Sequence, residues 1–351
     1  MHINELLSIA RTERASDVHI TADRNPLFRI DGSLRETEFA LSIDEKRHLI
    51  LSLLIDKQRQ RVEEGKDVDT SYETAGGMRH RVNVFHQQQR LAAAIRLLND
   101  NIPSFEELGL PEPLRALAEE PRGLILVTGP TGSGKSTTLA AMVDYVNTKR
   151  ACHILTVEDP VEYVYKQKRA LIHQRNVGED VDSFSDALRS AMREDPDVIL
   201  VGEMRDFETI SAAITAAETG HLVLSTLHTT GAAMTVDRII DVFPPHSQQQ
   251  IRTQLAGVLK GVVTQTLLPR ATGTGRIAAF EIMLGTDAVS TLIRESKGHQ
   301  INSIIQTGGR QGMILLDDYL SNLVRTGVVT REAALEKAAN KTEFLSAIGR
   351  M

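Results

Sequence analysis

Residues 123–139 read Gly123-Leu-Ile-Leu-Val-Thr-Gly-Pro-Thr-Gly-Ser-Gly-Lys-Ser-Thr-Thr-Leu139. The apolar start predicts a buried strand, the residues from Thr137 onward predict a helix, and a glycine-rich loop joins the two. Glycine tolerates backbone angles that other residues avoid, so the loop can turn its N–H groups toward an anion at the positive end of the helix dipole. The spacing G-x-x-x-x-G-K-S is that of a phosphate-binding loop. We therefore predict that this stretch binds a nucleotide.

The residues of the loop have separate expected roles toward ATP and Mg²⁺, the two predicted cofactors. Lys135 is expected to reach the β- and γ-phosphates, and the Ser136 hydroxyl is expected to ligate Mg²⁺. The other residues predicted to bind the nucleotide are Gly129, Pro130, Thr131, Gly132, Ser133, Gly134 and Thr137.

Hydrolysis also needs carboxylates, and acidic residues follow two of the predicted strands. Glu158 and Glu162 lie in the run 156–162, where Pro160 ends a strand, and Glu203 follows the apolar run 198–201. The carboxyl ends of strands in an open parallel sheet border the ligand. We predict that Glu203 ligates Mg²⁺ or orients the attacking water, a role that Glu158 or Glu162 could share. The alternative is that each acid is an ordinary solvated loop residue.

Two histidines flank a third apolar strand. His221 precedes the run 222–226 and His228 follows it closely. An imidazole at such a position can lie near the γ-phosphate and exchange protons near neutral pH. The alternative is structural, with His221 capping a turn and His228 starting the next helix.

Arginines on predicted strands of the N-terminal part are candidates for stabilising charge during phosphoryl transfer. Arg81 and Arg96 are the best candidates, because an arginine supplied by a neighbouring subunit often serves this purpose. The alternative interpretation is that they are surface arginines on a polar sheet face.

Composition restricts the possible functions. The 351 residues contain 40 Lys and Arg against 46 Asp and Glu, a net charge of −6, so no general basic field attracts nucleic acid. Aromatic residues make up 4% and Trp is absent, which removes stacking platforms for single strands. The single cysteine, Cys152, excludes an internal disulfide. Without a long apolar run, we predict a cytoplasmic protein that does not insert into a membrane.

The order of predicted elements indicates an α/β fold with two domains. Residues 1–98 alternate short strands and helices, including a hairpin around Asp31-Gly32 and a helix opened by Ser42 and Glu45. Pro103, Pro111 and Pro113, with Pro121 directly after them, mark a linker over 99–120. From 121 to 351, apolar strands alternate with helices, which predicts a parallel sheet covered on both faces. After Pro244-Pro245 we predict a helix, a strand over 276–283, and then helices only.

Four stretches in order resemble the secretion-type ATPases. They are the phosphate loop and the runs 156–162, 189–206 and 215–229, and the similarity extends over nearly the whole chain. The resemblance implies a PAS-like N-terminal domain, a RecA-like ATPase domain and assembly as a homo-hexamer. It also implies that Lys135 and Ser136 form the Walker A motif, that Glu203 is the Walker B glutamate, and that Arg81 and Arg96 face phosphate.

Within that family, the chain is most similar to the branch that retracts type IV pili and drives twitching motility. Extension and type II secretion ATPases usually have long additional N-terminal domains and a four-cysteine zinc segment, whereas this chain has one cysteine. The resemblance implies action on a platform protein of the inner membrane, at its cytoplasmic face. Residues 288–295 read Ala-Val-Ser-Thr-Leu-Ile-Arg-Glu, which keeps half of the retraction signature Ala-Ile-Arg-Asn-Leu-Ile-Arg-Glu.

Four other interpretations stay open at this point. The chain could be an accessory retraction paralogue that works beside a main motor, or a related secretion-type ATPase. A nucleic-acid translocase would use the same core, although net charge and the few aromatic residues argue against it. A non-catalytic nucleotide sensor is disfavoured because Lys135 and Glu203 are both present.

Overall fold

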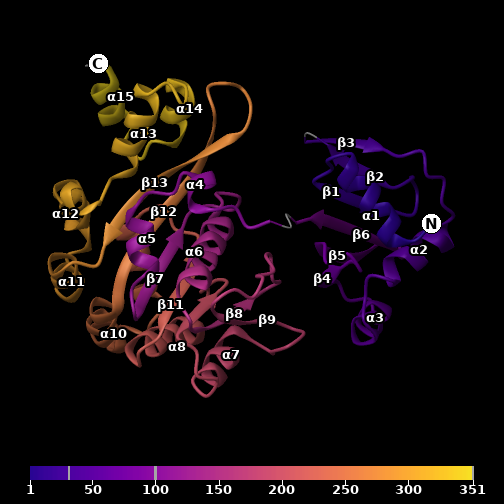
Figure 1. Ribbon diagram of the computed structural model, residues 1–351, viewed down its shortest axis with the longest axis horizontal. Helices are drawn as coiled ribbons and strands as arrows, with labels where there is room; N and C mark the ends of the chain where they lie inside the picture. The colour runs from indigo at the N-terminus through magenta and orange to yellow at the C-terminus, as the bar shows by residue number, and fades with distance from the viewer. Residues whose placement is uncertain (31, 99–100, 350–351) are drawn as a thin grey trace. The chain divides into compact units, whose positions relative to one another are not determined.

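The computed structural model describes residues 1–30, 32–98 and 101–349, which form two compact units (Figure 1). The first unit comprises Met1–Asn101 together with the short segment Pro160–Val164. The second comprises Ile102–Asp159 and Tyr165–Met351. Asp31 of the predicted Asp31-Gly32 turn, and Asn99 and Asp100 at the start of the predicted linker, lie outside the described residues.

The first unit is built on an antiparallel sheet of six strands in the order β3-β2-β1-β6-β5-β4. Its elements are α1 (Ile3–Thr12), β1 (Asp17–Ile20), β2 (Leu27–Ile30), β3 (Ser33–Glu36), α2 (Ile43–Leu51), α3 (Asp56–Glu63), β4 (Val68–Glu73), β5 (Arg79–Gln87) and β6 (Arg90–Leu97).

One face of this sheet is apolar because residues alternate along its strands. Val18, Val82 and Ile95 are buried in one cluster with apolar residues of α1 and α2, while their strand neighbours point to the opposite face. Helix α2 begins with the predicted capping box. The Glu45 backbone N–H donates to Ser42 Oγ at 3.3 Å, and the Ser42 N–H donates to Glu45 Oε2 at 2.8 Å.

The second unit contains a sheet of seven strands in the order β13-β12-β7-β11-β10-β8-β9. All neighbouring strands are parallel except β12 and β13. Its strands are β7 (Gly123–Thr128), β8 (His153–Glu158), β9 (Leu171–Asn176), β10 (Val198–Val201), β11 (Leu222–Leu227), β12 (Leu259–Pro269) and β13 (Arg276–Leu284).

The helices of the second unit fill the connections and the C-terminal part of the chain. They are α4 (Phe105–Leu108), α5 (Pro113–Ala118), α6 (Lys135–Lys149), α7 (Phe184–Ala191), α8 (Phe207–Glu218), α9 (Ala232–Asp241), α10 (Pro245–Val258), α11 (Asp287–Arg294), α12 (Ile301–Thr307), α13 (Leu316–Arg325), α14 (Arg331–Lys337) and α15 (Lys341–Gly349), with short 3-10 turns η1 (Gly298–Gln300) and η2 (Gly308–Gln311).

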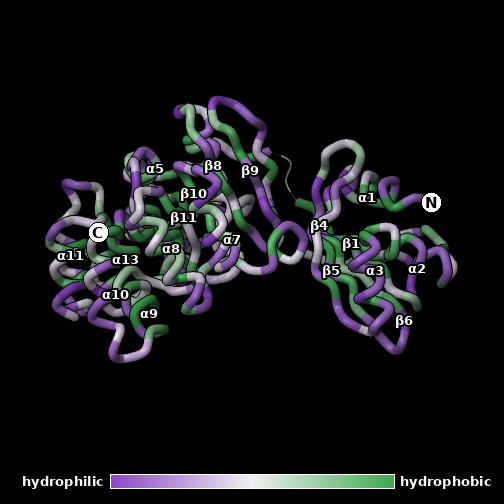
Figure 2. Tube along the Cα trace, turned by 90° about the horizontal axis from the view of Figure 1, so that it is seen from below, coloured by the Kyte–Doolittle hydropathy of each residue, from purple (hydrophilic) through white to green (hydrophobic). Residues whose placement is uncertain are grey.

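Both faces of the central strands are covered, as the continuous apolar runs predict. Leu124 and Leu126 of β7 pack into a cluster with α8 to α12, whereas Ile125 and Val127 are fully buried on the other face, where α6 packs. Figure 2 shows hydrophobic residues concentrated along strands such as β10 and β11. This burial on both sides fixes β7 rigidly beneath the loop that follows it.

The structure differs from the sequence prediction in three segments. Residues 259–269 form strand β12 where we predicted only helix before residue 276, and β9 was not predicted. The predicted linker contains the short helices α4 and α5, which belong to the second unit. They are anchored there because Phe105 contacts Tyr145 of α6, and Leu114 and Leu117 are buried.

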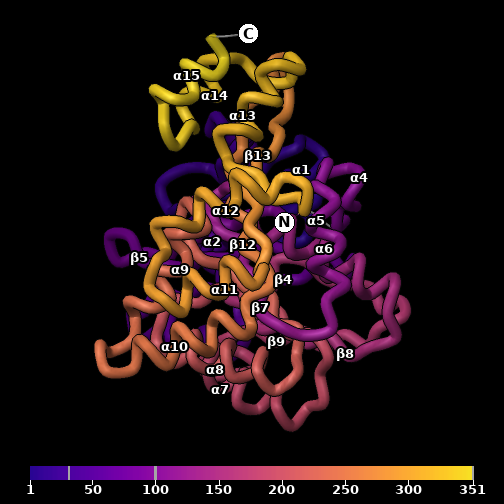
Figure 3. The backbone as a smooth tube through the Cα atoms, turned by 90° about the vertical axis from the view of Figure 1, so that its left-hand side faces the viewer, coloured from indigo at the N-terminus to yellow at the C-terminus, as the bar shows by residue number. Residues whose placement is uncertain are grey.

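The chain ends in helices, as predicted from residue 288 onward. Figure 3 shows α13, α14 and α15 gathered at one end of the second unit, where α13 packs on β13. Leu320 and Phe344 form a cluster there with Leu268 of β12. Over the described residues, no helix combines the length and the apolar character needed to cross a bilayer.

Candidate nucleotide site

The predicted phosphate loop connects the buried strand β7 to helix α6, which begins at Lys135 and runs for 15 residues. Gly129, Gly132 and Gly134 have φ angles of +139°, +78° and +89°, values that L side chains rarely adopt. Gly134 is the N-cap of α6. The loop therefore lies at the positive end of a helix dipole, an arrangement that favours phosphate.

Side chains within the loop also fit a bound phosphate. The Ser133 hydroxyl is buried and has no hydrogen-bond partner among the described residues, which normally costs about 1–3 kcal/mol. Lys135 is only 8% exposed, and its ammonium group donates to the backbone carbonyls of Gly129 at 2.8 Å and Pro130 at 3.1 Å. A buried hydroxyl and a buried ammonium at the start of a helix are donors of the kind that a polyphosphate requires.

Ser136 is exposed in the first turn of α6, next to Lys135. A hydroxyl at this position fits the requirement of Mg²⁺ for oxygen ligands. Groups of three or more His, Cys, Asp or Glu arranged to hold a metal ion are not found in the described part of the chain. A site built from one hydroxyl together with phosphate oxygens needs no such group, so the residues present fit a metal that arrives with the nucleotide.

The ends of three further strands lie at the same edge of the sheet as the loop. Leu227 of β11 is paired with Thr128 of β7, and the Gly129 N–H donates to the Leu227 carbonyl at 3.3 Å. Gly202, which follows β10, donates to the Val157 carbonyl of β8 at 2.8 Å and accepts from the Thr226 hydroxyl at 2.7 Å. These bonds hold the ends of β8 and β10 at the same edge of the sheet as the end of β11.

Glu203 lies at this edge, directly after Gly202. Its carboxylate is paired with Arg205 Nε at 2.7 Å and with His228 Nε2 at 3.5 Å, and its side chain is 20% exposed. His228, which follows β11, is thus in contact with the predicted catalytic acid. A carboxylate and an imidazole thus lie together at the edge of the sheet that carries the phosphate loop. Such a pair can orient a water molecule and accept a proton from it.

Glu158 is the last residue of β8 and is buried, with 9% of its surface exposed. It accepts a hydrogen bond of 2.8 Å from the Thr156 hydroxyl. Glu162 lies in Pro160–Val164, the segment that belongs to the first unit. The second unit therefore brings together the phosphate loop, Glu158, Glu203 and His228, but not Glu162.

His221 is not brought to this edge. It precedes β11, and its ring Nδ1 lies 2.9 Å from the Ala216 carbonyl and 3.3 Å from the Thr219 hydroxyl. The six-residue strand that separates it from the loop edge spans, at about 3.3 Å per residue, roughly 20 Å. The structure thus corrects the expectation that both histidines approach the phosphate: within this chain His221 closes the turn after α8, the structural alternative.

The two predicted arginines are neighbours on the polar face of the first unit's sheet. Arg81 of β5 is directly opposite Arg96 of β6, and Arg96 is opposite Asp17 of β1. Arg96 Nε donates to Asp17 Oδ1 at 3.0 Å, yet its side chain is 66% exposed. Arg29 extends the row across β2, 3.7 Å from Asp17 Oδ2. This row across the sheet therefore contains three guanidinium groups and one carboxylate.

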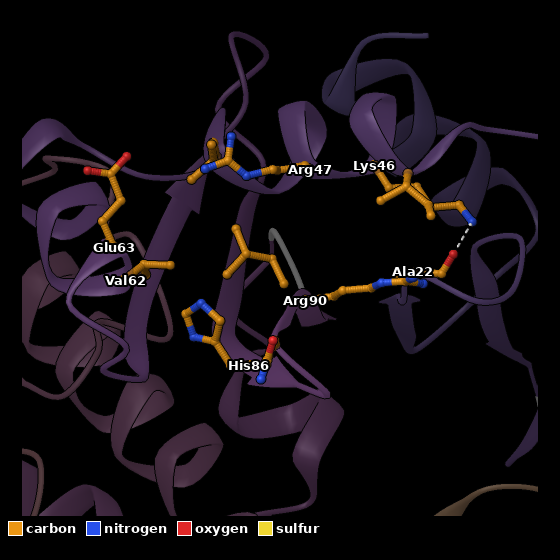
Figure 4. A pocket seen from close by; sticks show the side chains of 11 residues that line it. Ala22, Lys46, Arg47, Val62, Glu63, His86 and Arg90 are labelled. Carbon is orange, nitrogen blue, oxygen red and sulfur yellow. Dashed lines mark hydrogen bonds between the residues drawn. The ribbon is translucent and has the colours of Figure 1, made fainter.

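A separate cavity of about 400 Å³ lies within the first unit and contains none of the predicted site residues. Figure 4 shows Lys46, Arg47 and Arg90 around it, with Lys46 donating to the Ala22 carbonyl at 3.0 Å. Arg90 is paired with Asp23 at 3.0 Å. Three cationic side chains therefore line the cavity, and a carboxylate neutralises one of them. This lining differs in composition from the phosphate loop.

Sequence reasoning missed the buried residues that support the loop from β12. Gln265 donates to the Ser133 carbonyl at 2.8 Å and accepts from the Thr138 hydroxyl at 2.7 Å. The signal was present in the run Val262-Val-Thr-Gln-Thr266, where β-branched residues favour a strand. The contact itself joins residues more than 120 positions apart and could not be derived from local pattern.

Comparison with known proteins agrees with this geometry. Residues 1–342 match the family described as Type II/IV secretion system protein. This chain belongs to the Type II/IV secretion system protein family. Its α/β fold, a RecA-like domain preceded by a smaller α+β domain, is confirmed by the match to a solved member of the family.

Two pilus ATPases and one solved structure are similar to this chain over nearly its whole length. The type IV pilus retractation ATPase PilT of Pseudomonas aeruginosa is 50% identical over 345 residues, 98% of this chain and 100% of that protein. The type IV pilus ATPase PilU of the same organism is 37% identical over 99% of this chain and 92% of its own length. A crystal structure of the pilus retraction motor PilT with bound ADP superposes with a TM-score of 0.92 at 45% identity, and each chain is covered completely.

Proposed function

We propose that this chain is a Mg²⁺-dependent ATPase that works as a homo-hexamer and drives the retraction of type IV pili. The observation that carries the proposal is 50% identity over 98% of the chain to a retraction ATPase. The loop geometry supports it independently, because the Ser133 hydroxyl and the loop N–H groups fit a polyphosphate. A structural relative that contains ADP adds support for nucleotide as the ligand.

The proposed chemistry assigns a separate task to each group at the sheet edge. Lys135 and the loop amides hold the β- and γ-phosphates, with Gly129 to Thr137 enclosing them. Glu203 orients the attacking water and accepts its proton, and His228 holds Glu203 in place through the contact at 3.5 Å. Bound Mg²⁺ supplies charge neutralisation on the phosphates, and Ser136 is the ligand that this chain offers.

The remaining predicted residues complete the site in our proposal. Glu158 lies at the same sheet edge and assists Glu203, and we assign Glu162 a supporting role as well. Arg81 and Arg96 offset the charge that develops on the transferred phosphoryl group, acting from a neighbouring subunit of the ring. An arginine of this kind is worth about 10³–10⁵ in turnover rate.

Domain motion is proposed to convert hydrolysis into mechanical work. We assign residues 1–98 to a PAS-like domain and residues 121–351 to the RecA-like ATPase domain, with α4 and α5 of the predicted linker 99–120 packed onto the ATPase domain. Turnover would change the angle between the two domains. A ring of such subunits would act on a platform protein of the inner membrane, from the cytoplasmic face.

Two proteins of Pseudomonas aeruginosa in the comparison, PilT and PilU, are both named as pilus ATPases, which raises the question of a main or an accessory role. Identity of 50% to PilT against 37% to PilU favours the main motor. We include a paralogous ATPase among the proposed partners of this chain. The half-matching run 288–295 forms helix α11, outside the phosphate loop, and so leaves the chemistry unaffected.

Deletion of the gene tests the proposed function in cells. We expect loss of twitching and accumulation of surface pili, with both restored by the wild-type gene but not by a Lys135→Ala gene expressed at the same level. Normal twitching in the deletion strain would contradict the role as main retraction motor. Rescue by Lys135→Ala would contradict the requirement for ATP hydrolysis.

A further inference from the structure

Strand β12 lies beside β7 and places two buried polar residues against the phosphate loop. Thr264 is paired with Thr128, the last residue before the loop, and their hydroxyl groups are 2.9 Å apart. Gln265 follows and is 3% exposed. Burial of a polar side chain costs free energy unless its hydrogen bonds are made. The hydrogen bonds of Gln265 therefore indicate its role.

Both ends of the Gln265 carboxamide are occupied. Its Nε2 donates to the Ser133 carbonyl within the loop at 2.8 Å, and its Oε1 accepts from the Thr138 hydroxyl of α6 at 2.7 Å. Thr138 is 1% exposed. A single side chain from β12 thus joins the loop to the helix that the loop caps, and solvent cannot replace either bond.

Gly129 and Gly134 of the loop lie so close to Gln265 that a side chain at either position would clash with it. A Cβ atom at Gly129 would lie 2.2 Å from the Gln265 carbonyl oxygen, and one at Gly134 would lie 2.8 Å from Gln265 Nε2. Close approach of β12 therefore demands glycine at both positions, in addition to their positive φ angles. The loop and Gln265 form one packed unit.

The bond to Ser133 has a directional consequence. In a trans peptide the C=O and the following N–H point in opposite directions. Because Gln265 holds the Ser133 carbonyl toward β12, the N–H of Gly134 must point away from β12. Rotation of this peptide would turn an N–H donor away from the phosphate side of the loop.

We propose that Gln265 is a positioning residue that keeps the phosphate loop in its binding conformation before nucleotide arrives. This inference rests on the proposed function, since it assumes that the loop binds nucleotide. When the loop is already ordered in the folded protein, nucleotide binding does not have to order it. Without Gln265 the loop must be ordered on binding, and the free energy required for this weakens nucleotide affinity. Loss of Gln265 therefore weakens nucleotide affinity, whereas kcat, measured at saturating ATP, changes little.

The test is the affinity of the full-length protein for ADP with Mg²⁺, measured by calorimetry for wild type, Gln265→Met and Gln265→Glu. Met has nearly the shape of Gln without its hydrogen bonds, and we expect ADP to bind about tenfold more weakly, with kcat within about threefold of wild type. Glu places a carboxylate against the Ser133 carbonyl and should weaken binding further. Gln250→Glu, on the exposed surface of α10, makes the same charge change and should leave ADP affinity unaltered.

A double-mutant cycle with Thr138→Val separates positioning from general destabilisation. If both side chains act through their shared bond, the affinity loss in Gln265→Met with Thr138→Val is smaller than the product of the single losses. Losses that simply multiply would overturn the proposal. The Thr138→Val arm gives an answer even if a Gln265 variant fails to fold, because it alone should weaken ADP binding severalfold.

Failure of this inference can be distinguished from failure of the proposed function. If wild type does not bind ADP with Mg²⁺, the proposed function fails. If wild type binds ADP and Gln265→Met binds it equally well with a lowered melting temperature, Gln265 is only a structural residue and the positioning role is rejected.

Discussion

Among single residues, Lys135 has the most direct role in the proposed chemistry. Its ammonium group is buried against the carbonyls of Gly129 and Pro130, at the first residue of α6. A loop of the same shape without this charge would hold polyphosphate weakly and stabilise its cleavage poorly.

Substitution of Lys135 is therefore the first prediction. Lys135→Ala should reduce ATP turnover to background, because both phosphate binding and charge stabilisation are removed. Lys149→Ala, at the other end of α6, is the matched control and should keep the wild-type rate. Phosphate release from the purified proteins gives the answer, and turnover near wild type in Lys135→Ala would reject the site.

Glu203 carries the second prediction. Glu203→Gln keeps the shape but removes the base, so nucleotide should still bind while kcat falls about 10²–10⁴-fold. Arg205→Gln is the control: the Arg205 side chain is 72% exposed, so solvent screens its ion pair with Glu203 and its loss should change kcat little. Calorimetry and steady-state kinetics separate the two effects, and loss of nucleotide binding in Glu203→Gln would mean that Glu203 is structural.

At the scale of elements, Glu281 of β13 joins segments that are distant in sequence. Its carboxylate accepts from the Ala232 N–H at 2.8 Å and from the Leu316 N–H, and these lie at the starts of α9 and α13. Helix α9 follows the segment that carries His228. The buried Glu281 carboxylate thus holds the N-terminus of α9 together with the N-terminus of α13.

This carboxylate provides a prediction about pH. Burial raises the pKa of Glu281 above its usual 4.5, although the Ala232 and Leu316 N–H groups oppose the rise. The folded state then binds the proton more tightly than the unfolded state, so its contribution to the free energy of unfolding decreases as pH rises from about 4.5 through the raised pKa. Glu281→Gln lacks this titration.

Urea unfolding of wild type and Glu281→Gln over that pH range checks the sign. The free energy of unfolding of wild type minus that of the variant should fall as pH increases, since titrations common to both proteins cancel. A difference that stays constant or grows with pH would show that Glu281 does not titrate as its burial implies.

The same elements show what the sequence could predict. The β7-loop-α6 unit is local, and its strand, glycine spacing and helix are all encoded within 27 residues, Gly123–Lys149, so it was predicted closely. Strand β12 was missed because it directly follows α10, and its apolar run continued the helical pattern. Gln265 could not be assigned a role without that strand. The error for His221 is different: a parallel strand sends its two ends to opposite edges, so one strand cannot bring both of its flanking histidines to the loop.

At the scale of the whole molecule, the proposed ring requires that a site be completed by a neighbouring subunit. Arg96 is exposed and cross-strand to Arg81, and neither lies in the unit that contains the phosphate loop. In our proposal these arginines act between subunits, which can be tested by mixing defective chains.

Rings assembled from Arg96→Ala and Lys135→Ala subunits test this arrangement. Each parent should lose about 10³-fold or more of its turnover. A mixed ring contains some sites with an intact loop from one subunit and an intact arginine from the next, so turnover should exceed that of both parents. Mixed rings no more active than the parents would mean that Arg96 does not act across an interface.

The central claim is that ATP is cleaved at the loop between β7 and α6, and its most direct measurement is the release of inorganic phosphate by the purified full-length protein. We predict release that requires both ATP and Mg²⁺, that stops when Mg²⁺ is chelated, and that is absent in Lys135→Ala. Release that continues without Mg²⁺ or survives Lys135→Ala, or no release from folded wild type, would contradict the account.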